Sequence, residues 1–131
     1  MLFRSPWAAW VAEEKAVPLA YIRKAKKGYG AGKQIEGSDV NQKTVLIIED
    51  LISTGGSSIS AVESTRNEGG IVHNIAAIFS YGFKKSQSNF TDNSCELHVL
   101  ADFNSLMTAA KSEGYITEAE AVELESWHQQ N

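Results

Sequence analysis

Two kinds of hydrophobic pattern alternate along the chain. Continuous runs of β-branched and aliphatic residues are typical of buried strands, whereas apolar residues spaced three or four apart are typical of helices with one buried face. The first pattern predicts strands at 19–22, 44–48, 71–79 and 96–100. The second predicts helices at 7–15, around 59–66, at 103–110 and at 117–127. Because strands alternate with helices, we expect an α/β fold with a parallel sheet, in a single domain over residues 1–131.

Polar residues and glycines mark the expected helix ends. Ser5 is placed to cap a helix with Pro6 at its first position, and Asp102 is placed to cap another. Thr117 and Glu120 have the spacing of a capping box, and Gly69 suits the position just after a helix. Trp7 and Trp10 share a helical face, which predicts a core or interface position for both.

Composition restricts the classes of function. The chain has 131 residues with 12 basic and 16 acidic side chains, a net charge of −4, which disfavours binding of nucleic acid through overall charge. No apolar run approaches the roughly 18 residues of a membrane helix, and the lone Cys95 cannot form an internal disulfide. We therefore expect a soluble, cytoplasmic protein. Its three histidines are scattered, so we expect no metal site built from them.

The most informative segment is Val45–Ser57, in which a buried strand ends in Glu49 and Asp50 and a turn rich in Gly and Ser follows. Ligands of parallel sheets bind beyond the carboxyl ends of the strands. Two glycines, the hydroxyls of Thr54, Ser57 and Ser58, and a helix N-terminus suit a phosphate group. Adjacent carboxylates suit the paired hydroxyls of a ribose or a Mg²⁺ ion. This combination predicts a ribose 5-phosphate site, whereas the motifs for nucleoside triphosphates and dinucleotides are absent.

A second segment concentrates positive charge in an otherwise acidic protein. Five of the 12 basic residues lie between residues 23 and 33, interleaved with glycines. Such a segment suits a mobile loop that folds over a polyanion such as pyrophosphate and neutralises the charge that develops as it departs. The alternative is a solvated surface loop without a ligand. The basic residues are Arg23, Lys24, Lys26, Lys27 and Lys33.

These two segments together resemble the orotate phosphoribosyltransferases, a branch of the type I phosphoribosyltransferase family. The acidic pair followed by Ser53–Ser57 looks like the family's motif for phosphoribosyl pyrophosphate (PRPP), and Arg23 to Lys27 followed by Ile35–Gly37 resembles the orotate branch. The similarity continues through Ala76–Gly82 and the C-terminal helices. The resemblance implies a Rossmann-like parallel-sheet core. It also implies that the chain begins after an N-terminal portion which family members carry.

The resemblance implies a Mg²⁺-dependent reaction in which the ribose 5-phosphate group of PRPP passes to orotate, giving orotidine 5′-monophosphate and pyrophosphate in pyrimidine (UMP) biosynthesis. Lys27, Asp50 and Glu49 would be catalytic. Orotate would contact Ser53 and Tyr81. Mg²⁺ would be held mainly through PRPP and not by a direct side-chain cluster. A homodimer is implied, in which the basic loop reaches the partner's site. The implied PRPP-binding residues are Arg23, Lys24, Lys27, Tyr29, Glu49, Asp50, Leu51, Ile52, Ser53, Thr54, Gly55, Gly56 and Ser57.

Two alternatives remain open at this point. Tyr29 stands where the family usually has a histidine, and a tyrosine can donate a hydrogen bond but carries no positive charge. This favours a truncated or degenerate relative that binds PRPP or ribose phosphate without catalysis. Val45–Asp50 also resembles the acidic first strand of response-regulator receiver domains. A receiver needs a further aspartate at the end of a later strand, and the strand that ends at Phe79 has none.

Overall fold

The computed structural model describes residues 2–3, 6–23 and 34–131, and for residues 2–3 only the backbone. It is an α/β structure with six strands in one sheet. The strands are β1 (Leu2–Phe3), β2 (Ala20–Ile22), β3 (Ile35–Gly37), β4 (Thr44–Ile52), β5 (Ile71–Ser80) and β6 (Glu96–Asp102). The helices are α1 (Trp7–Glu14), α2 (Gly56–Asn67), α3 (Lys84–Asp92), α4 (Phe103–Ser112) and α5 (Glu118–Gln129).

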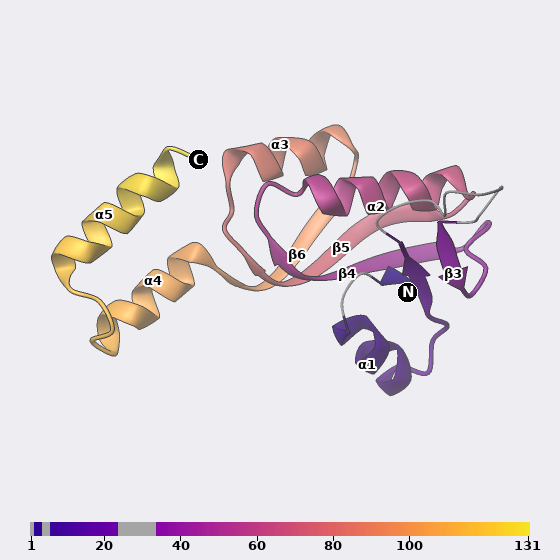
Figure 1. Ribbon diagram of the computed structural model, residues 1–131, viewed down its shortest axis with the longest axis horizontal. Helices are drawn as coiled ribbons and strands as arrows, with labels where there is room; N and C mark the ends of the chain where they lie inside the picture. The colour runs from indigo at the N-terminus through magenta and orange to yellow at the C-terminus, as the bar shows by residue number, and fades with distance from the viewer. Residues whose placement is uncertain (1, 4–5, 24–33) are drawn as a thin grey trace.

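The sheet has the strand order β3-β2-β1-β4-β5-β6. All neighbouring strands pair in parallel except β2 and β3, which pair antiparallel. From β1 the chain leads through α1 to β2 on one side, whereas from β4 it leads through α2 to β5 on the other side (Figure 1). The strand order therefore reverses between β1 and β4. In sheets of this kind the crevice at that reversal, outside the carboxyl ends of the strands, is where ligands bind.

Strand β4 lies in the middle of the sheet because its sequence can be covered on both faces. Val45, Ile47 and Ile52 are buried in the main core with residues of α2 and β5, and Ile48 is buried as well. The expected strand over 44–48 is thus confirmed, but it continues to Ile52 and includes both acidic residues. Glu49 and Leu51 pair with Ala77 and Phe79 of β5, which extends the strand beyond its apolar run.

The two faces of the sheet are covered unequally. Helices α2 and α3 lie on one face and α1 lies on the other (Figure 1). Helix α1 buries Ala8 and Ala12, whereas Trp7 and Trp10 are exposed and stack edge to face at 5.1 Å. Of the two positions expected for the tryptophans, core or interface, the core is excluded, because α1 packs on the sheet through its small alanines; the interface position stays a prediction. Beside the tryptophans, Leu100 of β6 is 85% exposed.

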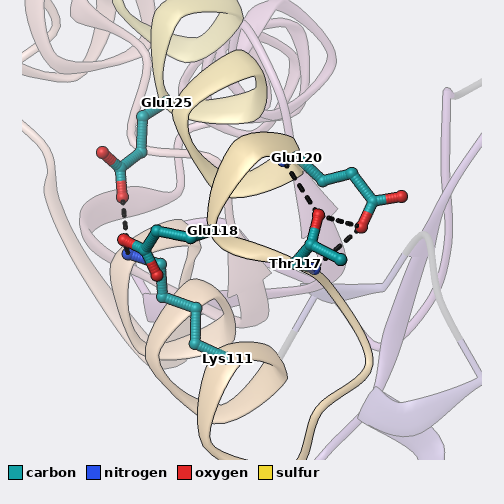
Figure 2. A network of polar contacts seen from close by, with 5 residues as sticks. All are labelled: Lys111, Thr117, Glu118, Glu120 and Glu125. Carbon is teal, nitrogen blue, oxygen red and sulfur yellow. Dashed lines mark hydrogen bonds and ion pairs between the residues drawn. The ribbon is translucent and has the colours of Figure 1, made fainter.

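Helices α4 and α5 form a hairpin that projects away from the sheet (Figure 1). Both predicted caps are confirmed: the Asp102 carboxylate accepts a hydrogen bond from the Ser105 backbone N–H at 2.8 Å, and Thr117 forms a capping box with Glu120. Figure 2 shows this box and the Lys111 ammonium, which lies 3.1 Å from Glu118 and 3.7 Å from Glu125. These ion pairs are exposed, so the buried residues between the helices contribute more to the packing. Those residues are Phe103, Met107 and Ala121.

Three elements were not expected from the hydrophobic pattern: the short strands β1 and β3, and helix α3. Helix α3 is largely polar, and Phe90 is its one apolar residue, so no repeat of apolar positions marks it in the sequence. The predicted cap of α1 cannot be compared, because Ser5 lies outside the described residues, and Pro6 itself precedes the first helical residue. Among the described helices none is long and apolar enough to cross a membrane.

Candidate active site at the carboxyl edge of the sheet

The carboxyl ends of the parallel strands bring most of the candidate residues to one edge. Strand β2 ends beside Arg23, β4 ends at Ile52 before the turn 53–55, and β5 ends at Ser80. The Tyr81 backbone N–H donates to the Ile52 carbonyl at 3.0 Å, so the exits of β4 and β5 lie together. The structure thus places the acidic pair, the glycine turn and Tyr81 at one edge, as the sequence predicted. Lys24, Lys27 and Tyr29 lie outside the described residues.

The glycine turn leads directly into α2. Gly55 precedes the first helical residue with φ = 78°, a left-handed conformation that a residue with a side chain adopts only at a cost. A Cβ atom at Gly55 would lie 2.9 Å from Cζ of the buried Phe90 ring, which leaves no room for a methyl group. Gly55 has no side chain that could cap α2, and the helix begins directly after the turn. A helix N-terminus carries the positive end of the helix dipole and is suited to a phosphate group.

Helix α3 supports the turn from outside. The Asn89 side-chain amide donates a hydrogen bond to the Thr54 carbonyl at 2.9 Å, and the Phe90 ring packs against Gly55. Ser53, Thr54, Gly56 and Ser57 are exposed, whereas Gly55 is buried under Phe90. Two residues of α3 therefore fix the backbone of a turn whose other residues face the solvent. Asn89 and Phe90 were not found from the sequence, because they act from a helix 35 positions further along the chain.

The acidic residues Glu49 and Asp50 have opposite surroundings, because successive side chains of a strand point to opposite faces. Glu49 is 5% exposed and accepts a hydrogen bond at 3.0 Å from the hydroxyl of Ser58, which is fully buried. Asp50 is exposed, and its carboxylate accepts from the Leu51 backbone N–H at 2.8 Å. The expectation that the Ser58 hydroxyl faces a phosphate is wrong: it points into the protein and bonds the carboxylate.

Arg23 lies at the base of the basic segment, where β2 and β3 pair. Its guanidinium forms an ion pair with Glu36 at 2.6 Å, and its backbone N–H donates to the Gln34 carbonyl. The Nε atom of Arg23 is buried without a hydrogen-bond partner among the described residues. The antiparallel pair holds both ends of the segment 24–33 together at the edge where β2 ends. Arg23 thus lies at the carboxyl edge of the sheet, where a pyrophosphate-binding residue is expected, but its ion pair with Glu36 neutralises part of its charge.

Tyr81 belongs to an aromatic cluster that joins the sheet to α5. Its ring stacks on Phe83 at 5.2 Å and meets Trp127 edge to face at 6.0 Å. The His128 ring stacks on Phe103 at 4.1 Å and its Nε2 hydrogen-bonds the Tyr81 carbonyl. Two residues of α5, Trp127 and His128, therefore contact Tyr81. A groove of about 760 Å³, lined by Tyr81 and by apolar residues of α4 and α5, opens beside this cluster.

Two other kinds of reactive group could supply chemistry in the described residues, the thiol of Cys95 or a cluster of metal ligands. Burial raises the pKa of the Cys95 thiol, although the nearby Arg66 guanidinium opposes the effect, so the thiol stays protonated at neutral pH. Within the part of the chain that the structure describes, no group of three or more His, Cys, Asp or Glu residues could hold a metal ion. The candidate groups at this edge of the sheet are therefore the turn 53–55, the N-terminus of α2 and the carboxylates of Glu49 and Asp50.

Comparison with protein families gives a match for most of the chain. The model of the phosphoribosyl transferase domain matches residues 5–106. The orotate phosphoribosyltransferase of Staphylococcus aureus is 41% identical over 122 residues, which are 93% of this chain and 60% of that protein. The chain therefore spans about three fifths of the length of this relative. The resemblance found in the motifs is confirmed by these matches.

Solved structures of similar fold agree. The orotate phosphoribosyltransferase of Aeropyrum pernix is 25% identical with a TM-score of 0.73, over 88% of this chain and 64% of that one. The UMP synthase of Leishmania donovani has a TM-score of 0.81 at 23% identity, over 99% of this chain and 28% of that one. Because its identity is only 23%, the second match is evidence for the fold alone. It covers nearly the whole chain, and therefore also the C-terminal hairpin. The expected parallel-sheet phosphoribosyltransferase core is confirmed.

Proposed function

Because the chain belongs to the phosphoribosyl transferase domain family, we propose that it binds PRPP at the carboxyl edge of its sheet and transfers the ribose 5-phosphate group to orotate. The observation that carries the proposal is the juxtaposition of the turn 53–55, the N-terminus of α2 and the carboxylates of Glu49 and Asp50. The identity to named orotate phosphoribosyltransferases supports orotate as the acceptor. We treat residues 1–131 as one phosphoribosyltransferase domain of the cytoplasm, acting in pyrimidine (UMP) biosynthesis.

The proposed roles follow from the surroundings of each residue. The backbone N–H groups of the turn and of Gly56 and Ser57 bind the 5-phosphate, with the Thr54 and Ser57 hydroxyls beside them. Glu49 and Asp50 accept hydrogen bonds from the ribose hydroxyls, which orients the sugar ring. Ser53 and Tyr81, on adjacent strand exits, contact orotate. Leu51 and Ile52 contribute backbone to the PRPP site.

The transfer breaks the bond between C1 of the ribose and the pyrophosphate oxygen, and forms a bond between C1 and a ring nitrogen of orotate. The proton of that ring N–H passes to water or to the departing pyrophosphate, so that atoms and charge balance. Both electrons of the broken bond leave with the pyrophosphate, so negative charge grows on it while C1 becomes oxocarbenium-like. Arg23, Lys24, Lys27 and Tyr29 are the residues proposed to stabilise the departing group, Lys27 with its full charge and Tyr29 by hydrogen bonding. The rest of the rate acceleration comes from holding the two reactants close together in the correct orientation.

Mg²⁺ and a second subunit complete the proposal. The described residues offer single carboxylates and no cage of ligands, which suits a Mg²⁺ ion that enters with the phosphates of PRPP and keeps several waters. Bound there, the ion would supply positive charge to the pyrophosphate. A homodimer would let the basic segment of one subunit reach the site of the other. Light scattering at several protein concentrations tests the dimer, and a constant monomer mass would refute it.

The second candidate is a relative that binds PRPP or ribose phosphate without catalysis. Tyr29, which carries no positive charge, favours it. A turnover assay with PRPP, Mg²⁺ and orotate decides between the two candidates, because orotate absorbance falls as the product forms. Consumption of orotate by the wild type that is lost in Lys27→Ala supports the enzyme. Binding of PRPP with no consumption of orotate supports the binding protein instead.

A further inference from the structure

The carboxylate of Glu49 is an unusual feature of the site because it is buried. Burying a carboxylate costs free energy unless hydrogen bonds compensate the lost hydration. Here the Ser58 hydroxyl donates to Glu49 Oε1 at 3.0 Å, and Ser58 itself is fully buried. The two residues are nine positions apart and connect the end of β4 with the first turn of α2. The bond thus links the acidic side of the site to the phosphate side.

We infer that Ser58 is a positioning residue, which fixes the Glu49 carboxylate for recognition of the ribose hydroxyls. The inference rests on the proposed function and adds to it a residue that has no contact with the ligand. Ser58 cannot serve the phosphate itself, since its hydroxyl is directed inward and fully buried. Its neighbour Ser57 is exposed on the same turn of α2 and remains the residue for the phosphate.

The difference between the two acids explains why one of them needs such support. Asp50 is exposed and accepts a hydrogen bond from the adjacent Leu51 N–H, so its own backbone orients it. Glu49 has one more rotatable bond, and its carboxylate lies over the buried start of α2 instead of in water. Without the hydroxyl, Glu49 Oε1 loses a partner in a place that water reaches poorly. The carboxylate would then change rotamer, and its oxygens would leave the ribose position.

The test compares two ligands by calorimetry, ribose 5-phosphate and inorganic phosphate. Only the first has the hydroxyls that Glu49 would bind. We expect Ser58→Ala to weaken ribose 5-phosphate binding roughly fivefold to tenfold, which is the contribution of one ordinary hydrogen bond. Phosphate binding should stay within about twofold, because the turn is unchanged. The matched control is Ser60→Ala, which removes an exposed hydroxyl of the same helix and should alter neither ligand.

A double-mutant cycle identifies the residue through which Ser58 acts. In the Glu49→Gln background, Ser58→Ala should change ribose 5-phosphate affinity by less than about twofold, because the carboxylate that it positions is gone. If Ser58→Ala does not fold, as judged by circular dichroism, Ser58→Cys replaces it, since a thiol of similar size is a weaker donor. That variant should lie between the wild type and the Glu49→Gln variant in affinity.

Three results would overturn the inference. Equal loss of both ligands in Ser58→Ala means that the hydroxyl only stabilises α2. Unchanged ribose 5-phosphate binding in a folded variant means that Glu49 does not need it. In both cases the wild type still binds the sugar phosphate, so the proposed function stands. If the wild type binds no ribose 5-phosphate, the proposed function fails and the inference fails with it.

Discussion

Gly55 is the position where the structure predicts the largest effect of a single methyl group. Its φ of 78° is left-handed, a conformation that costs alanine about 1–2 kcal/mol. The added Cβ would also lie 2.9 Å from Cζ and 3.2 Å from Cε2 of Phe90. Phe90 is buried and cannot turn away, and overpacking of this kind costs about 1–3 kcal/mol. We therefore expect Gly55→Ala to lower the free energy of unfolding by about 2–5 kcal/mol.

Gly114 provides the matched control for this substitution. Its φ of 73° is nearly the same, but no atom lies within 4 Å of the Cβ position, so Gly114→Ala carries only the conformational cost of about 1–2 kcal/mol. Urea unfolding of both variants, followed by circular dichroism, separates the two terms. Adding Phe90→Leu to Gly55→Ala removes the ring atoms in contact and should recover part of the loss. A Gly55→Ala variant no less stable than Gly114→Ala would refute the account of this turn.

Three further predictions concern the support of the site and the hairpin. Asn89→Ala removes the hydrogen bond to Thr54 and should lower the urea-unfolding free energy by about 0.5–1.5 kcal/mol, and an unchanged midpoint would contradict the role of α3. Hydrogen bonds from Ser105 hold the pKa of Asp102 below its ordinary value of 3.8, so the cap of α4 is complete above about pH 4 and is lost as the pH falls through the lower folded value. Helix content measured from pH 6 to 2 should show this loss in the wild type and less of it in Asp102→Asn, which caps without titrating; identical curves would exclude the cap as the cause. His128→Ala removes one ring stack and one hydrogen bond and should loosen α5, which a red shift of tryptophan fluorescence would report and an unchanged spectrum would deny.

The sequence predicted the elements that depend on strand burial or on hydrogen bonds between residues close in the chain. Strands β4 and β5 have long apolar runs because they lie inside the sheet, and Asp102 and Thr117 cap helices through local hydrogen bonds. Helix α3 was missed because Phe90 is its one apolar residue, and a single apolar position forms no repeating pattern. Elements with a clear local signal were thus predicted, and an element without one was missed.

The sequence indicated the contiguous motif of the candidate site, but not the residues that pack against it and hold it in place. Glu49 and the glycine turn are contiguous in sequence, so their meeting at one edge could be foreseen. Asn89, Phe90 and the inward direction of Ser58 depend on how α2 and α3 pack over β4, which a linear pattern does not contain. The exposed position of Trp7 and Trp10 has the same origin, because the tertiary contact selected the alanine face of α1.

The most direct test of the central claim is calorimetry with PRPP and Mg²⁺ on the wild type and on Asp50→Asn. The substitution removes one charge from an exposed side chain whose hydrogen bond is with the adjacent Leu51 N–H, so the fold should be unaffected. The account predicts saturable binding of one PRPP per site by the wild type, and weaker binding by Asp50→Asn. No binding by the wild type, or equal binding by both proteins, would contradict the assignment of the PRPP site.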